Sequence, residues 1–281
     1  FIKKNDEVVA SFHLFLNDKK IKKSNLIYTS INYKKYQNIN QSSINYKKYQ
    51  INQIYTDYIY KNYDSGEFNL DLHTSDLRTF FWKNFDLKKE VFSVYQVRYT
   101  SIIKLDNDLS INPNLDTTTN YSNFSRSIKS QYQKAMKEDF LIREEFNEKV
   151  LVKIISKTLA NINDSNFDIE KNLIIYKELF KNGFIKMFIC SKKGEDLAFC
   201  LFSIIKERSF YLNGGRLLSG NDDLSLTYNL IKSFQMLSKL GVKILDLEGV
   251  NSPRRSFWKS GFGGNLLPYY GIKFICLTLS K

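Results

Sequence analysis

The chain has 281 residues, of which 43% are hydrophobic and 15% aromatic, so it can bury a sizeable core and is neither a disordered nor a collagen-like polymer. Lysine and arginine number 42 against 29 acidic residues, which gives a formal net charge of +13. Because no apolar run approaches the ~20 residues that span a bilayer, we expect no transmembrane segment.

Part of the positive charge is concentrated near the N-terminus. Eight lysines and no acidic residue lie between Lys19 and Thr56. A basic patch of this kind attracts RNA, nucleotide phosphates or an anionic membrane surface. Lysines also outnumber arginines 34 to 8, as an AT-rich coding bias would produce, and arginine is the usual residue for bidentate phosphate recognition. Both interpretations of the basic segment stay open.

The first 120 residues predict several strands and a helix. Alternating apolar residues favour strands over 7–16 and 24–33, joined by a polar turn at 17–19. Apolar residues at helical spacing from Ile51 to Ile59 predict a helix that stops at Asp64. Strands over 68–72 and 91–105 follow, and residues 109–120, which include Pro113, form a linker.

A short repeat lies within this part of the chain. The heptapeptide INYKKYQ occurs at residues 31–37 and again at 44–50. Two copies with a period of 13 are too few and too short for a solenoid. We interpret residues 31–50 as a tandem duplication in a surface loop, since loops tolerate insertions at small entropic cost. One copy is then expected in the framework and the other exposed.

The second half is more regular. Amphipathic patterns predict helices over 122–138, 147–160, 169–181 and 225–240. A hairpin is expected from 184–191 and 197–206, a third strand over 209–213 that ends at Gly214-Gly215, a buried strand over 242–247 and final strands within 265–279. The order indicates an α/β fold with one strand-helix-strand crossover inside a mostly antiparallel sheet.

Two motifs in this half resemble a known family. The segment Phe257-Trp-Lys-Ser-Gly-Phe-Gly-Gly264 follows an acidic strand end, a glycine and a short helix. The predicted helix after Phe124 carries a basic face of Arg126, Lys129, Lys134 and Lys137. Both resemble the FemAB-like branch of the GNAT acyltransferase superfamily, whose members add amino acids to peptidoglycan precursors.

The resemblance implies a mixed, mostly antiparallel sheet flanked by helices, in two tandem GNAT-like halves. We expect residues 1–120 to form a reduced N-terminal half with the duplicated loop, and residues 121–281 the C-terminal half. It also implies a bacterial acyltransferase of cell envelope biogenesis, acting on peptidoglycan or a surface polysaccharide, without a tightly bound cofactor. The acyl donor is expected to be aminoacyl-tRNA or an acyl-CoA.

One departure from the wider superfamily bears on the donor. Acetyl-CoA-dependent GNAT enzymes hold the pyrophosphate on a glycine-rich loop at the start of the central helix. The corresponding residues 221–229 contain no glycine and carry Asp222 and Asp223, whose carboxylates would repel a pyrophosphate. This favours aminoacyl-tRNA, which is the typical donor of FemAB-like proteins.

Two carboxylates at the end of the predicted strand 242–247 are the catalytic candidates. Asp246 and Glu248 are two residues apart, so an extended chain would present them on one side. Ligands gather at the carboxyl ends of strands in open α/β sheets, and a carboxylate there could accept the proton of an attacking amine. Glu248 is preferred because Gly249 would let the backbone turn away. Purely structural ion pairs are the alternative.

The remaining candidates are substrate-binding residues. Arg254, Arg255 and Lys259 would suit a diphosphate or carboxylate on the acceptor, and Lys259 matches the family's lysine that contacts a sugar-nucleotide acceptor. Asn213 precedes a strand break whose N–H groups could polarise a carbonyl. Arg78 and Trp82 lie in a stretch that could cradle a sugar or nucleotide. A solvated turn, a simple strand end and core packing are the respective alternatives.

Cysteine and histidine usage argues against other chemistry. Cys190, Cys200 and Cys276 are well separated in apolar segments, which predicts reduced thiols in a cytoplasmic protein. The histidines His13 and His73 have no evident cysteine or serine partner, so we expect neither a catalytic triad nor a metal site.

The sequence therefore predicts acyl or aminoacyl transfer to an amine of a cell-envelope precursor. The expected acceptor is a nucleotide-sugar or lipid-linked amine, and tRNA is the expected macromolecular partner. A cytoplasmic enzyme could also work at the inner face of the membrane, through peripheral contact. Two alternatives stay open: an acetyl-CoA-dependent N-acetyltransferase with an atypical pyrophosphate site, and a non-catalytic basic module that binds polyanions.

Overall fold

The computed structural model describes residues 1–12, 14–22, 28, 31–72, 74, 76–105, 121–162, 168–217 and 224–276, with the backbone alone for residues 160–162 and 254. These residues form two compact units, one from 1–99 with 267–281 and one from 100–266. The predicted linker at 109–120, both histidines and Asp222 and Asp223 lie outside the described residues. No helix that the structure describes has the length and apolar character needed to cross a bilayer.

The sheet of the second unit is mixed and mostly antiparallel. Its strand order is β7-β12-β11-β10-β9-β8. The bounds are β7 Phe92–Lys104, which begins in the first unit, β8 Leu141–Glu144, β9 Ile185–Lys192, β10 Glu195–Ile205, β11 Arg208–Arg216 and β12 Ile244–Asp246. Strand β12 pairs parallel with β11 and antiparallel with β7. Helix α6 (Ser225–Lys239) connects β11 to β12, as the predicted crossover requires.

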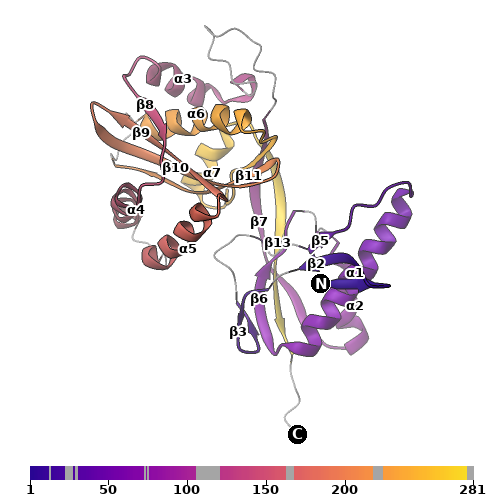
Figure 1. Cartoon of the computed structure of the whole chain (residues 1–281). Coiled ribbons are helices and arrows are strands. Elements are labelled where there is room, and N and C mark those ends of the chain that lie inside the picture. The colour runs from indigo at the N-terminus through magenta and orange to yellow at the C-terminus, as the bar shows by residue number, and fades with distance from the viewer. Residues whose placement is uncertain are drawn as a thin grey trace. The chain divides into compact units, whose positions relative to one another are not determined.

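Helices cover both faces of this sheet (Figure 1). Helices α3 (Arg126–Ala135), α6 and α7 (Pro253–Ser260) pack one face, around Phe234 and Phe262. Helices α4 (Glu148–Ile162) and α5 (Ile169–Lys181) pack the other face, around Ile154 and Phe199. Local sequence sets the ends, because Ser125 caps α3 with its side chain and Gly241, with a φ of +85°, follows α6. The predicted α/β fold is confirmed.

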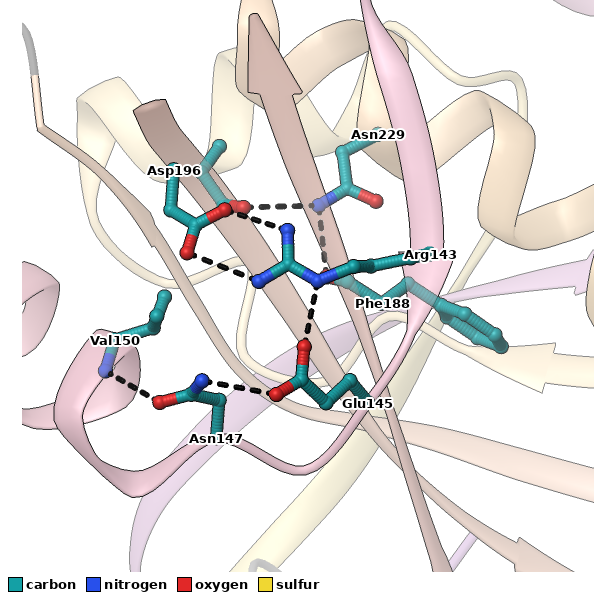
Figure 2. Close-up of polar contacts among 8 residues, drawn as sticks. Arg143, Glu145, Asn147, Val150, Phe188, Asp196 and Asn229 are labelled. Carbon is teal, nitrogen blue, oxygen red and sulfur yellow. Dashed lines mark hydrogen bonds and ion pairs between the residues drawn. The ribbon is translucent and has the colours of Figure 1, made fainter. Parts of the chain in front are cut away.

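A polar network joins β8, the start of β10 and the start of α4. Figure 2 shows Arg143 with both guanidinium NH groups directed at Asp196, at 2.5 and 2.9 Å, and its Nε 2.6 Å from Glu145. The Asn147 side chain then accepts a hydrogen bond from the Val150 N–H at 3.2 Å. These carboxylates raise the pKa of Arg143. The short strand β8 is thereby tied to the hairpin beside it.

The first unit has two groups of strands and two helices. Strands β1 (Ile2–Lys4), β2 (Glu7–Phe12) and β5 (Ile31–Tyr33) form a three-stranded sheet. Strands β3 (Leu16–Asn17), β4 (Lys20–Ile21), β6 (Ser65–Asn69) and β13 (Asn265–Ile275) follow in the order β3-β4-β6-β13. Helices α1 (Gln41–Asn62) and α2 (Arg78–Leu87) share their core. That core includes Tyr55, Phe68, Phe80, Phe92 and Phe274.

The two repeat copies adopt different secondary structures. In the first copy Ile31–Tyr33 form β5, because they pair with β2 through Ile31↔Phe12 and Tyr33↔Ala10. The second copy lies inside α1, which begins after Asn40, whose side chain accepts a hydrogen bond from the Ser43 N–H at 2.8 Å. Each copy thus contributes to a regular element, and residues 31–50 are not the surface loop that we predicted. Helix α1 starts ten residues before the predicted helix at 51.

The compact units also differ from the predicted split at residue 120. Strand β7 runs across residue 100, and the end of the chain belongs to the first unit because β13 pairs with β6 through Gly271↔Asn69 and Ile275↔Ser65. Such non-local pairing leaves no local signal in the sequence. Whether residues 1–120 derive from a GNAT-like half stays a prediction. The cysteines are free thiols, with Cys190 and Cys200 buried.

Candidate functional site

Strands β11 and β12 part at their carboxyl ends. They pair in parallel from Arg208↔Ile244 to Phe210↔Asp246, where β12 ends. Strand β11 continues to Arg216, so among the described residues its second half has no partner in β12. A parting of parallel strands at their carboxyl ends is where ligands bind in open α/β sheets.

Asp246 shapes the turn that leaves β12. Its side chain is 1% exposed. The carboxylate accepts hydrogen bonds from the Thr100 hydroxyl and from the Glu248 N–H, the latter at 2.7 Å. These contacts direct Asp246 into the protein, where it positions the turn. Its predicted catalytic role stays a prediction.

Glu248 sits at the turn itself. It has a φ of +53°, in the left-handed region that costs a non-glycine residue about 1–3 kcal/mol. The predicted extended pair with a turn at Gly249 is therefore wrong, because Glu248 makes the turn and Gly249 does not have a positive φ. Burial raises the pKa of the Glu248 carboxyl to about 8, the Asp246 charge adds to the rise, and Lys259 opposes it.

Lys259 stabilises this turn through hydrogen bonds to its backbone. The side chain is 9% exposed, and Nζ donates to the carbonyl oxygens of Leu247 at 2.6 Å, Glu248 at 3.2 Å and Gly249 at 3.5 Å. It also lies 5.1 Å from the centre of the Tyr211 ring. Burial lowers the pKa of Lys259, against the pull of Glu248. Lys259 is thus a buried cation bound to protein carbonyls, which excludes the alternative of a solvated side chain. Its predicted contact with an acceptor stays a prediction.

The arginines of the same segment begin α7, after Pro253. Arg255 is exposed. Burial lowers the pKa of Lys259 and raises that of Tyr211; the Arg255 charge adds to the first shift and opposes the second, so it lies within electrostatic range of the turn. Its binding of an anionic group of the acceptor stays a prediction. The side chain of Arg254 lies outside the described atoms.

Asn213 lies on β11, at an irregularity of the strand pairing. The pairing of β11 with β10 shifts by one residue between Leu201↔Asn213 and Phe202↔Tyr211, a β-bulge. The side-chain oxygen Oδ1 of Asn213 accepts a hydrogen bond from the Gly214 N–H at 2.8 Å. The Asn213 side chain is also hydrogen-bonded to the Tyr176 hydroxyl. Burial raises the pKa of Tyr176, and the nearby Glu248 charge adds to the rise.

Tyr176 is a site residue that the sequence did not indicate. It comes from α5 and is nearly buried, and it joins Asn213 and Glu248 in one polar cluster at the parted strands. Its only sequence signal is a position on the apolar face of a helix, and the chain has 18 tyrosines.

The glycine pair after Asn213 does not end the strand. Strand β11 runs on to Arg216. A Cβ on Gly214 would lie 1.9 Å from the Tyr211 hydroxyl, and one on Gly215 would lie 2.8 Å from Cγ2 of Ile154 in α4. Close approach, not a turn, explains why both positions are glycine.

The two motifs that carry the family resemblance touch each other. The Ser125 N–H at the start of α3 donates to the Gly261 carbonyl oxygen at 2.8 Å. The rings of Phe124 and Phe262 lie 5.7 Å apart, and Gly263, with a φ of +73°, passes so close to Asn123 that a Cβ would lie 2.4 Å from its carbonyl oxygen. The glycines of the motif let α7 pack on α3.

The basic face of α3 points mainly to solvent. Arg126, Lys134 and Lys137 are exposed, while Lys129 donates to the Ser122 carbonyl oxygen at 2.8 Å. The helix therefore presents charge at the surface and apolar side chains to the core.

Arg78 and Trp82 lie in the first unit, on α2. Arg78 is held by Asp76 through two hydrogen bonds of 2.7 and 2.8 Å. Its guanidinium lies 5.6 Å from the Trp82 ring centre and 5.5 Å from that of Tyr49. Arg78, Trp82 and Tyr49 form one aromatic cluster within the first unit.

Comparisons with known proteins place the fold. Neither a protein-family model nor a curated protein sequence matches this chain. Among solved structures, FemX is similar over 95% of this chain and 88% of its own, with a TM-score of 0.61 and 13% identity. L-PGS from Bacillus licheniformis is similar over 96% and 82%, with a TM-score of 0.54 and 11% identity.

A third structure is the C-terminal domain of a protein assigned as a lysylphosphatidylglycerol synthetase from Agrobacterium fabrum. It is similar over 94% of this chain and 80% of its own, with a TM-score of 0.53 and 9% identity. At these identities the likeness establishes the fold. The layered sheet, the parting of β11 from β12 and the similarity to FemX together show that this chain has the fold of the FemAB-like branch of the GNAT superfamily.

Proposed function

We propose that the protein transfers an acyl or aminoacyl group to an amine of a cell-envelope precursor. The observation that carries the proposal is the Glu248 carboxyl, held in a left-handed turn where β11 and β12 part, with its pKa raised to about 8. A general base works best when its pKa lies near the working pH. The similarity of the fold to FemX supports a transferase.

In the proposed reaction Glu248 takes a proton from the acceptor ammonium. The freed amine forms a C–N bond with the carbonyl carbon of the donor ester or thioester. The bond from that carbon to the donor's oxygen or sulfur then breaks, and the leaving atom takes the second proton from the nitrogen. Asn213 and Tyr176 would orient the donor carbonyl beside the β11 bulge.

The donor we propose is aminoacyl-tRNA. The exposed cations Arg126 and Lys134 on α3, and Lys137 just after it, suit the phosphates of RNA. Such contacts weaken as salt rises. Residues 221–229 lack the glycines that hold pyrophosphate in acetyl-CoA-dependent relatives. Arg255 at the exposed face of α7 would meet an anionic group of the acceptor, such as a diphosphate or carboxylate.

Mass spectrometry of an acceptor amine tests the proposal. The chain is incubated with a nucleotide-linked muropeptide or an amino-sugar nucleotide, together with charged tRNA or acetyl-CoA. We expect a mass increase equal to one aminoacyl group with charged tRNA, absent in Glu248→Gln. Acetyl transfer from acetyl-CoA instead would overturn the choice of donor. No transfer from either donor, with tight salt-sensitive binding to generic polyanions, would favour a non-catalytic module.

A further inference from the structure

The first unit contains a pocket of about 590 Å³ between α1 and α2. Three of its residues, Tyr49, Gln53 and Asp57, recur every four positions along one face of α1. The α2 side includes Trp82 and Lys83. The full lining is Tyr49, Gln53, Thr56, Asp57, Thr79, Trp82, Lys83, Phe85 and Asp86. All of these residues belong to the first unit, whereas Glu248 belongs to the second.

Aromatic rings form one wall of this pocket. The rings of Tyr49 and Trp82 lie 5.5 Å apart at an interplanar angle of 62°. Trp82 is 47% exposed and Phe85 82% exposed, so these large apolar groups face solvent and not the core. A tryptophan half open at a pocket offers a face on which the C–H groups of a ligand can stack.

Polar side chains form the rest of the lining. Lys83 Nζ lies 2.7 Å from an Asp57 carboxylate oxygen, a donor and an acceptor side by side. Gln53 and Asp86 add exposed amide and carboxylate groups. Below them the hydroxyls of Thr56 and Thr79 meet at 3.2 Å, both buried. Such a set of neighbouring donors and acceptors matches the vicinal hydroxyls of a polar, uncharged ligand.

The charges of the pocket lining distinguish between phosphate-bearing, apolar and saccharide ligands. Lys83 is paired with Asp57, and Arg78 beside the pocket is neutralised by Asp76. Asp86 therefore leaves the lining with a negative balance, which disfavours a phosphate-bearing ligand such as a nucleotide. The buried hydroxyls and the ion pair disfavour a purely apolar ligand. A saccharide has both the apolar C–H face and the hydroxyl groups that this lining requires.

We propose that this pocket binds a saccharide, stacked on Trp82 and hydrogen-bonded by the Asp57–Lys83 pair, Gln53 and Asp86. The duplicated heptapeptide supplies part of the site, since Tyr49 is the second tyrosine of the second copy. The first copy has Tyr36 at the matching position, where the Lys47 ammonium lies 4.9 Å from its ring centre. The inference concerns the first unit alone and does not depend on the transferase activity.

The chain contains two tryptophans, which makes the test direct. In a Trp258→Phe variant Trp82 is the single tryptophan, and its fluorescence is followed during titration with tri-N-acetylchitotriose and with maltotriose. We expect a saturable change with at least one of them. Isothermal titration calorimetry on the unaltered chain gives the same affinity without the variant, should Trp258→Phe fail to fold.

Two tyrosines of the same repeat copy provide matched variants. Tyr49→Ala should weaken saccharide binding up to about tenfold, as the loss of one aromatic contact predicts. Tyr46→Ala is the control, since Tyr46 is 62% exposed and outside the lining. No saturable change with either saccharide would overturn the proposal, as would equal effects of the two variants. A response only to vesicles of anionic phospholipid would instead identify a lipid-binding face.

Discussion

The ammonium of Lys259 lies 2.6 Å from the carbonyl oxygen of Leu247. This contact joins a buried cation of α7 to the last residue before the Glu248 turn. Two further carbonyls, of Glu248 and Gly249, share the same ammonium. The left-handed backbone at Glu248 is therefore held by interactions from outside the turn, which is how strained conformations persist at functional sites.

Replacing this lysine tests its role as a holding group. Lys259→Met removes the donor of three carbonyls, so the free energy of unfolding should fall by about 1–3 kcal/mol or more, the cost of leaving buried acceptors without a partner. Arg255→Gln is the control, because Arg255 is exposed in the same helix and should change stability by less than about 0.5 kcal/mol. Urea denaturation of both variants provides the comparison, and an unchanged midpoint for Lys259→Met would contradict the assignment.

Glu248→Gln should separate activity from stability. Transfer should slow by about 10²–10⁴, the usual contribution of a general base. Because the folded chain holds its proton more tightly than the unfolded chain, Glu248 makes folding less favourable as pH rises from about 4.5 to about 8. The variant should therefore have a higher Tm than the original chain at pH 8 and an equal Tm at pH 4.

Glu207→Gln is the matched control for that comparison. Glu207 is exposed and paired with Lys243 at 2.5 Å, so its loss should leave both rate and Tm nearly unchanged. If Glu207→Gln slowed transfer as much as Glu248→Gln, the base would have been assigned to the wrong residue.

The raised pKa of Glu248 also predicts the pH profile of transfer. The carboxylate form grows as pH rises through about 8, so kcat/KM should rise with a slope near one between pH 6 and 8 and level off above. In Glu248→Gln that rise should disappear. A rate that falls over the same range in the unaltered chain would show that the protonated form is the active one.

Replacement of Gly214 and of Gly249 by alanine should affect the stability of the fold differently. A Cβ at position 214 would lie 1.9 Å from the Tyr211 hydroxyl, so Gly214→Ala should destabilise the fold by about 1–3 kcal/mol, as overpacking does. Adding Tyr211→Phe should recover part of the loss. At Gly249 a Cβ meets only Asn251, at 3.8 Å, and Gly249→Ala should be neutral. Thermal denaturation of the three variants measures these changes in stability. An equal loss of stability for Gly214→Ala and Gly249→Ala would contradict the close contact at Gly214.

Much of the second unit could be predicted from local patterns. The helix over 169–181 and the crossover from β11 through α6 to β12 follow from amphipathic spacing and matching end signals. The first unit was harder, because β13 pairs with β6 across some 200 residues and two-residue strands such as β3 have no periodicity. Pairing at that distance is set by packing and not by neighbouring residues.

The candidate site was predicted in its residues more than in its geometry. Glu248 and Asn213 both act on the Tyr176 hydroxyl, and their roles in catalysis stay predictions. The contribution of Tyr176 needed the packing of α5 against the sheet. The inward direction of Lys259 could be predicted only with knowledge of the turn at Glu248. The pattern of residue types does not reveal that turn, because a glutamate with left-handed backbone is uncommon.

The two copies of the heptapeptide are under different constraints in the evolution of this sequence. One string of seven residues reads as strand plus coil at 31–37 and as helix at 44–50, so identical letters hold two conformations in the same molecule. The two copies differ in their structural surroundings. Strand β2 pairs with the first copy, and Asn40 caps the helix that contains the second. A substitution that favours helix is therefore tolerable in one copy and harmful in the other, and the two should drift apart in opposite directions from their common origin.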